Sequence, residues 1–226
     1  MREIVLDTET TGLNYKNGDR IIEVGCVETK NYVATGKTLS FYCRVDKEIS
    51  EEAKKISGIS NEFLKDKKTF AEHHGDFVDF IKNDPLIIHN AAFDLGFINN
   101  ELKLIGKEGL KNDVIDTVSL ARKVLNTRIA NLDYLCRHFN IDLSKRELHG
   151  ALLDAELLAE VYLELRGGKQ ITMDLLNKEK NQNNKLTKSI IQSQNTTKTN
   201  ITEEDLRSHK LMLNEIKKPL WKKYHY

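Results

Sequence analysis

Three β-prone runs with short connections open the chain, and they restrict its fold more than any other sequence feature. The runs are residues 2–6, 20–28 and 38–45. Turn signals separate them, at Gly18-Asp19 and at Thr35-Gly36-Lys37. Because such closely spaced strands favour antiparallel pairing, the first 45 residues predict a three-stranded antiparallel meander.

Helical patterns and short apolar runs alternate in the part that follows. The helical patterns span 50–56, 69–82, 91–105, 118–124, 131–139 and 150–165, and the strand-like runs are 86–88 and 114–115. The last helix is apolar nearly all round and should be buried. This order predicts an α/β fold in which a mixed sheet, three antiparallel strands plus parallel strands, is flanked by helices.

The composition changes after Gly168. Residues 177–200 are mostly Asn, Lys, Gln, Thr and Ser, which predicts a flexible polar linker. From Lys169 onward 12 Lys/Arg stand against 6 Asp/Glu, whereas the first 168 residues hold 23 against 28. An acidic domain of this kind needs bound cations if it acts on a polyanion such as a nucleic acid.

A helical segment is expected again within residues 201–226, where Thr202 precedes three acidic residues. Its apolar stripe consists of Leu206, Leu213, Ile216 and Leu220, followed by Trp221. A short helix cannot bury such a stripe alone, so the segment predicts a protein partner. Non-specific contact between the basic tail and DNA is the alternative.

The chain has no feature of a secreted or membrane protein. Its three cysteines, Cys26, Cys43 and Cys136, are widely spaced, which favours reduced thiols. It begins on a strand-like run, without an apolar signal stretch, and no run of 18 apolar residues occurs. We therefore expect a cytoplasmic protein that does not enter a membrane.

Asp7 and Glu9 form the first candidate site. Residues two apart on a strand project to the same face, so both carboxylates should point together near the end of the first strand. Adjacent carboxylates repel one another unless a proton or a cation lies between them, and hard divalent cations prefer oxygen ligands. A threonine-rich turn with solvated acids is the alternative interpretation.

Two further carboxylates occur at helix starts. Asp94 follows the apolar run 86–88 and His89, at a strand-to-helix junction that often binds ligands; it could equally complement the helix dipole. Asp154 lies in the apolar helix, where a buried carboxylate must be paired or bind metal. His149 can reach the same site only if it lies in the loop before that helix, and Gly150 permits the bend.

These residues occur in the order Asp, Glu, Asp, His, Asp, within LDTETTG (6–12), IIHNAAFDLGF (87–97) and LHGALLDAELLAEVYL (148–163). The pattern resembles the DEDDh exonucleases and, among them, the proofreading (epsilon) subunits of bacterial DNA polymerase III. The resemblance covers nearly the whole chain and implies a ribonuclease-H-like fold. It also implies 3′–5′ exonuclease activity in residues 1–168.

The resemblance implies a two-metal reaction with Mg²⁺ or Mn²⁺. Asp7, Glu9 and Asp154 would hold one ion, Asp7 would bridge to the second, and Asp94 would support both. His149 would be the general base for the attacking water, and nucleoside 5′-monophosphates would be released. The substrate would be a single-stranded or frayed DNA 3′ end, with little base preference.

Substrate contacts carried over from the family involve Asp7, Thr8, Glu9, Thr10, Thr11, Glu52, Ser57 and Asp154. Many members have histidine before the Gly-Ile pair, where this chain has Ser57. That departure weakens the expectation of a direct base contact at this position.

The tail also resembles functional segments of that family. Residues 169–176 are similar to a sliding-clamp-binding peptide, formed by Gln170, Ile171, Thr172, Met173, Asp174 and Leu175; a helix extension is the alternative. Residues 201–226 resemble the segment that binds the polymerase III catalytic (alpha) subunit. A small third core subunit occurs in some relatives, but nothing in this chain indicates it.

Two other functions fit parts of the sequence. The catalytic pattern suits a DEDDh exoribonuclease that trims RNA 3′ ends equally well, although such an enzyme needs neither a clamp peptide nor a polymerase-binding helix. A non-catalytic tether between clamp and polymerase is the second alternative, and the presence of all five catalytic residues argues against it.

Overall fold

The computed structural model describes residues 1–144, 146, 148–167, 203–204, 207–208 and 211–212. The chain divides into two compact units, residues 1–177 and 178–226. The six residues described in the second unit are helical and exposed. The clamp peptide, the linker and the stripe residues Leu206, Leu213, Ile216, Leu220 and Trp221 lie outside the described residues.

A five-stranded sheet with the order β3-β2-β1-β4-β5 forms the centre of the first unit. The strands are β1 (Arg2–Thr10), β2 (Ile21–Lys30), β3 (Val33–Tyr42), β4 (Leu86–Ile88) and β5 (Val114–Asp116). The β1–β2 and β2–β3 pairs are antiparallel, and β4 pairs parallel with both β1 and β5. The predicted mixed sheet is therefore confirmed.

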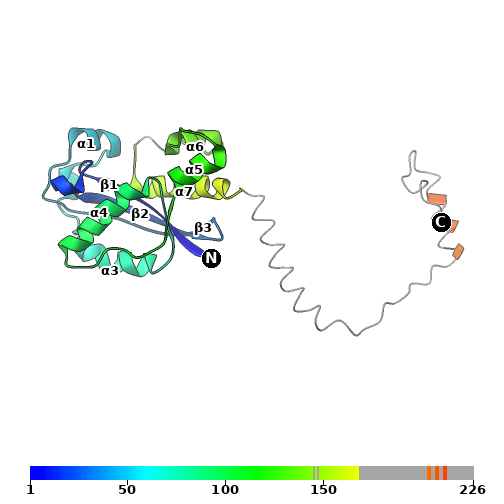
Figure 1. The fold of residues 1–226 in the computed structure, drawn as a ribbon, viewed down its shortest axis with the longest axis horizontal. Coiled ribbons are helices and arrows are strands. Elements are labelled where there is room, and N and C mark those ends of the chain that lie inside the picture. Colours follow the sequence, from blue (N-terminus) through cyan, green and yellow to red (C-terminus); the bar gives the residue numbers. More distant parts are fainter. Residues whose placement is uncertain (145, 147, 168–202, 205–206, 209–210, 213–226) are drawn as a thin grey trace, which may run out of the picture. The chain divides into compact units, whose positions relative to one another are not determined.

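Helices cover both faces of this sheet (Figure 1). They are α1 (Glu51–Ser57), α2 (Asn61–Leu64), α3 (Phe70–Ile81), α4 (Ala91–Leu104), α5 (Thr117–Leu125), α6 (Leu132–His138) and α7 (Ala151–Leu165), with a 3-10 turn, η1 (Tyr15–Asn17). Side chains of β1 alternate between two cores. Ile4 and Leu6 pack with α3 and α4, whereas Val5 packs with α5, α6 and α7.

The hairpin between β2 and β3 differs from its prediction. The turn is formed by Asn31 and Tyr32, whose φ angles of 52° and 70° suit a two-residue hairpin turn with the twist of the strands. Residues 35–37 lie inside β3, where the register shifts and Gly36 adopts a φ of 85°. The predicted turn at Thr35–Lys37 was wrong because Gly36 marks a bulge within the strand.

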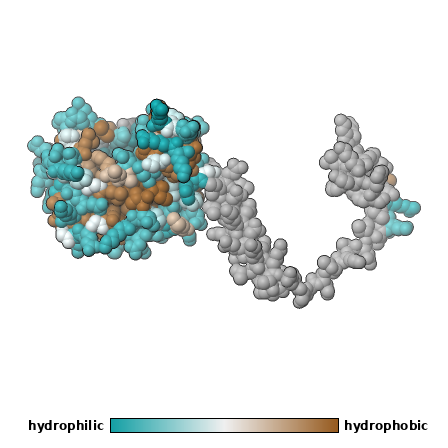
Figure 2. All heavy atoms as spheres, in the orientation of Figure 1, coloured by the Kyte–Doolittle hydropathy of each residue, from teal (hydrophilic) through white to brown (hydrophobic). Residues whose placement is uncertain are grey.

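The surface of this unit is mainly polar. Hydrophilic side chains cover most of the face seen in Figure 2, and a hydrophobic area interrupts them near its centre. Among the described helices, none combines the length and the hydropathy needed to cross a bilayer.

Candidate active site

Asp7 and Glu9 lie on β1 and project from the face of the sheet that α7 covers. Both are partly buried, and they pair in register with Gly25 and Glu23 of β2. Because Gly25 has no side chain, the sheet opposite Asp7 leaves room for the start of α7. The strand therefore presents two carboxylates toward one end of that helix.

Asp94 reaches the same end of β1 from the first turn of α4. Its side chain is 3 % exposed, and its Oδ1 accepts a hydrogen bond of 2.7 Å from Thr8 Oγ1. Thr8 lies between Asp7 and Glu9 and points toward α4, as strand alternation requires. The helix start predicted from the sequence thus places a third carboxylate beside the pair.

Asp154 and His149 come from the start of α7 and the loop before it. Asp154 lies in the first turn and is 4 % exposed, whereas His149 precedes the extended N-cap residue Gly150. His149 Nδ1 and Asp154 Oδ2 are 3.1 Å apart. This is the arrangement that the five-residue spacing requires, with the histidine in the loop and the carboxylate on the helix.

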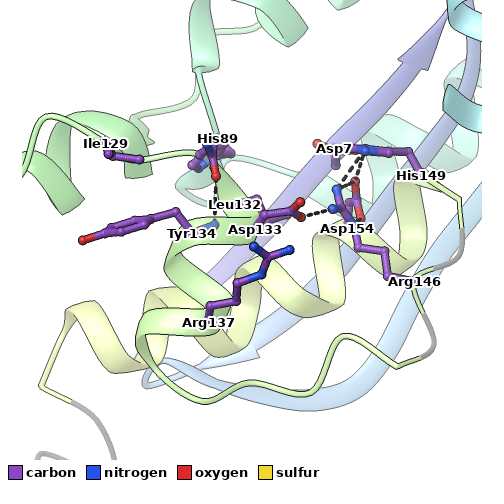
Figure 3. A pocket seen from close by; sticks show the side chains of 11 residues that line it. Asp7, His89, Ile129, Leu132, Asp133, Tyr134, Arg137, Arg146, His149 and Asp154 are labelled. Atoms are coloured by element: carbon purple, nitrogen blue, oxygen red, sulfur yellow. Dashed lines mark hydrogen bonds and ion pairs between the residues drawn. The ribbon is translucent and has the colours of Figure 1, made fainter.

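Glu9, His149 and Asp154 come close enough to share one cation. A ligand atom from each lies within 4.8 Å of the other two. Figure 3 shows Asp7, His149 and Asp154 together at one end of a cavity of about 600 Å³. Asn131, Tyr134 and Arg137, from α6 and its N-cap, also line the cavity, as does His89 after β4.

The buried carboxylates of the site repel one another. Burial raises the pKa of Asp7 well above its ordinary value, and the charges of Asp94, Asp154 and Glu9 raise it further. Burial also raises the pKa values of Glu9 and Asp94 to about 7. Oxygen ligands crowded in this way fit hard divalent cations, which would relieve the repulsion.

Arg146 is a member of the site that the sequence did not reveal. Its Nε and Nη2 donate to the two oxygens of Asp154 at 2.6 and 2.7 Å, and it also pairs with Asp133. Burial raises the pKa of Asp154, but hydrogen bonds from Arg146 and His149 outweigh burial and lower the pKa below its ordinary value. Each carboxylate oxygen has two lone pairs, so each oxygen of Asp154 can still face a cation while Arg146 is bound.

Arg146 also contacts the histidine. Its Nη2 lies 2.9 Å from His149 Nδ1, the same nitrogen that faces Asp154. One ring nitrogen cannot accept a hydrogen bond from Arg146 and donate one to Asp154 at the same time. The position of Arg146 therefore decides which tautomer of His149 the site favours.

Several residues predicted to bind substrate use their side chains within the protein. Thr10 Oγ1 donates to Gly12 O at 2.6 Å, and Thr11 Oγ1 accepts from the Arg20 backbone at 3.0 Å. Ser57 is buried, and its Oγ donates to Ala53 O at 2.9 Å at the end of α1. Glu52 is exposed on α1. The end of α1 reaches the site through its backbone, because His149 N donates to Ile56 O at 3.0 Å.

His89 lines the cavity, but its side chain makes a hydrogen bond within the protein. Its Nδ1 lies 2.9 Å from Thr117 Oγ1, and burial lowers its pKa below the ordinary value. His89 is therefore a packed, hydrogen-bonded histidine of the cavity wall.

Known proteins resemble this chain over nearly its whole length. Residues 4–162 match a family model described as an exonuclease. The DNA polymerase III epsilon subunit of Rickettsia conorii is 45 % identical over 226 residues, which cover 96 % of this chain and 97 % of the relative. The epsilon subunit of Escherichia coli is 40 % identical over 228 residues, with 96 % and 94 % covered.

Solved structures share the fold at low sequence identity. Exonuclease X in complex with 5′-overhanging duplex DNA has a TM-score of 0.57 and 22 % identity, covering 72 % of this chain and 90 % of that one. The nuclease domain of 3′hExo, a DEDDh family member bound to rAMP, has a TM-score of 0.64 and 17 % identity, with 74 % and 92 % covered.

Proposed function

Because this chain belongs to the exonuclease family, we propose that it is the 3′–5′ proofreading exonuclease of a bacterial replicative DNA polymerase. The observation that carries the proposal is the meeting of four carboxylates and one histidine at the end of β1, in the order typical of DEDDh enzymes. The identity of 40–45 % to epsilon subunits extends over nearly the full length of both chains. These relatives favour DNA as the substrate class.

Asp7, Glu9 and Asp154 would hold the divalent cations, with Asp94 in support. Two such ions, Mg²⁺ or Mn²⁺, supply stabilisation of the attacking and leaving oxygens at the scissile phosphate. Glu9 and Asp154 come from separate elements, β1 and α7, so the site is complete only when the helix lies correctly on the sheet. The cavity beside them is large enough to take a terminal nucleotide.

His149 would take the proton of the attacking water at Nε2. For that role Nδ1 must carry a proton and donate it to Asp154, which lies 3.1 Å away. Arg146 Nη2, which lies 2.9 Å from Nδ1, must then turn away from this nitrogen. Arg146 thus contacts both the carboxylate of Asp154 and the ring nitrogen that sets the tautomer of His149.

The substrate would be held by residues of β1, α1 and α7. Asp7, Glu9 and Asp154 would lie nearest the scissile phosphate, which links the terminal nucleotide to the rest of the strand. Thr8, Thr10 and Thr11 would contribute through backbone groups, because their hydroxyls are engaged. Glu52 would approach from α1, and a contact by Ser57 would require its hydroxyl to leave Ala53 O.

A test of this function compares a 3′-mismatched DNA primer with an RNA strand of the same sequence. We expect release of deoxynucleoside 5′-monophosphates with Mg²⁺ or Mn²⁺, none with EDTA, and slower cleavage of RNA. A mismatched end should be cut faster than a matched one because unpairing costs less. Efficient RNA trimming with little DNA cleavage would establish the exoribonuclease alternative, and no cleavage of either would favour the tether.

The tail would deliver the nuclease to the primer end. Residues 170–175 would bind the sliding clamp and residues 201–226 the polymerase catalytic subunit, while 177–200 would act as a linker that raises the local concentration of the nuclease. The match to epsilon subunits over 96 % of the chain supports this assignment.

Removal of residues 201–226 tests the polymerase contact. We expect the shortened chain to hydrolyse DNA at the rate of the full chain and to lose co-elution with the polymerase catalytic subunit in gel filtration. The control is the substitution of Gln170 and Leu175 by alanine, which should leave that co-elution intact. Undiminished co-elution of the shortened chain would overturn the assignment.

A further inference from the structure

Glu23 is a buried carboxylate beside the active site that the reaction described above does not use. It is 4 % exposed and lies near the start of β2, opposite Glu9 on one side and Tyr42 on the other. Directly paired residues project to the same face of a sheet, so Glu23 shares the face of the catalytic carboxylates. Burial of a charged group in such a place is costly unless hydrogen bonds satisfy it.

The partners of Glu23 are at the N-terminus of α7. Its Oε2 accepts a hydrogen bond of 3.1 Å from the backbone N–H of Ala151. The backbone of Leu152 and the hydroxyl of Tyr42 also lie near this carboxylate and lower its pKa, against the larger rise that burial causes. The first N–H groups of a helix lack partners within the helix, and the N-cap residue here, Gly150, has no side chain to offer. Glu23 therefore caps α7 from a neighbouring strand.

Gly25 makes this contact possible. It lies two residues further along β2, opposite Asp7. A Cβ at this position would lie 2.3 Å from the backbone of Ala151, so only glycine lets the first turn of α7 rest on the strand. The close approach and the carboxylate cap together hold the start of α7 at one place on the sheet.

We propose that Glu23 is a positioning residue for the exonuclease reaction, which sets Asp154 and the His149 loop against Asp7 and Glu9 by binding the N-terminus of α7. Asp154 lies three residues after Ala151 on the same helical turn, and His149 lies two residues before it. A shift of this turn would move both groups away from the carboxylates of β1. The inference rests on the proposed function for its biological meaning, but its structural part concerns the metal site alone.

The variants are chosen to separate capping from charge and from bulk. Glu23→Met keeps the approximate volume but accepts no hydrogen bond from the helix, whereas Glu23→Gln keeps an acceptor without the charge. The matched control is Glu3→Met. Glu3 is also a buried glutamate of the sheet, 1 % exposed, and its Oε1 accepts from the hydroxyl of Tyr162 at 2.9 Å, near the opposite end of α7.

The readout is the affinity for Mn²⁺, measured by calorimetric titration of the full chain without substrate. We expect Glu23→Met to weaken Mn²⁺ binding about tenfold or more, as loss of a ligand-orienting partner does. Glu23→Gln should restore most of that affinity, and Glu3→Met should bind like the unaltered chain. In DNA hydrolysis, Glu23→Met should lower kcat with little change in KM.

Three results would overturn the inference. Glu23→Met could bind Mn²⁺ like the unaltered chain, which would leave only a structural role. Glu23→Gln could lose as much affinity as Glu23→Met, which would make the charge and not the cap decisive. Glu3→Met could weaken Mn²⁺ binding equally, which would mean that loss of any buried contact to α7 weakens binding and that the cap has no special role.

Tyr42→Phe provides a second test if Glu23→Met does not fold. It keeps the ring and removes the hydroxyl that interacts with Glu23 across the pair of strands. We expect weaker Mn²⁺ binding in the same direction but by a smaller factor, and unchanged affinity would count against the inference. If the unaltered chain binds Mn²⁺ but degrades no DNA, the proposed function fails, while the positioning of the metal site by Glu23 is still tested.

Discussion

Replacement of Asp154 by alanine is expected to lower the rate of DNA hydrolysis roughly a thousandfold while the domain stays folded. A metal clamp contributes several kcal/mol to the transition state, and about 1.4 kcal/mol corresponds to a factor of ten. Asp154 is the carboxylate that joins α7 to the group on β1, so its loss should remove that contribution. Arg146 keeps a partner in the variant, because it also pairs with Asp133.

The measurement is the initial rate on single-stranded DNA with saturating Mg²⁺, beside circular dichroism of the variant. Glu156→Ala, two residues further along α7, serves as the control because Glu156 is exposed and not part of the cluster. Activity of Asp154→Ala within tenfold of the unaltered chain would refute the assignment of Asp154 as a metal ligand.

Asp7→Asn should have opposite effects on activity and stability. We expect the same loss of hydrolysis, together with a melting temperature higher by a few degrees in the absence of metal. Burial, and after it repulsion by the neighbouring carboxylates, raises the pKa of Asp7 in the folded state above the unfolded value near 3.9. Relief of about 1 kcal/mol corresponds to roughly 2–4 °C in a domain of this size.

The pH dependence of that gain has a defined sign. Between the unfolded and folded pKa values of Asp7, the folded state binds more protons, so the unaltered chain loses stability as the pH rises. Asparagine cannot ionise, so the gain of Asp7→Asn should be larger at pH 8 than at pH 5. Asp76→Asn, an exposed site on α3, should show no such trend. A lower melting temperature for Asp7→Asn would contradict the electrostatic account.

Substitution of His149 by glutamine is the second large effect. We expect kcat to fall roughly 10²–10⁴-fold, the usual contribution of a general base, with little change in Mn²⁺ affinity. The acidic limb of the pH–rate profile should also disappear. A hydrogen bond to Asp154 raises the pKa of His149 above its ordinary value, while burial and Arg146 oppose the rise. The base acts in its neutral form, so the unaltered rate increases with pH through this pKa.

If His149→Gln stops turnover but still binds Mn²⁺, then His149 acts as a general base and not as a metal ligand. His73→Gln, on α3, is the matched histidine control and should leave the profile intact. An unchanged kcat in His149→Gln, or a loss that occurs only through Mn²⁺ affinity, would remove His149 from the role of base.

The fold could be predicted from the sequence because strand-like and helical patterns alternate along the chain. Asp7 and Glu9 could be placed on one face because strand geometry is periodic, and β1 does run through both, from Arg2 to Thr10. The spacing of His149 and Asp154 could be interpreted because only a loop position of the histidine lets both meet. These inferences depend on local geometry, which is encoded within a few residues.

The parts that could not be predicted depend on contacts between distant segments. Glu23 interrupts an apolar strand, which signals a buried acid, but only the pairing register places it opposite Glu9. Arg146 reaches Asp154 because the loop before α7 folds back over the helix start, and no periodic pattern reports that. The bulge at Gly36 depends on the pairing of β2 with β3, so Thr35–Lys37 read as an ordinary turn.

The most direct test of the account is a calorimetric titration of Mn²⁺ into the metal-free chain in the presence of a nucleoside 5′-monophosphate. We expect two bound ions per chain, and we expect Asp154→Ala to lose at least one of them while Glu156→Ala keeps both. Equal binding by all three proteins, or no binding by the unaltered chain, would contradict the claim that the carboxylates at the end of β1 and the start of α7 form a two-metal site.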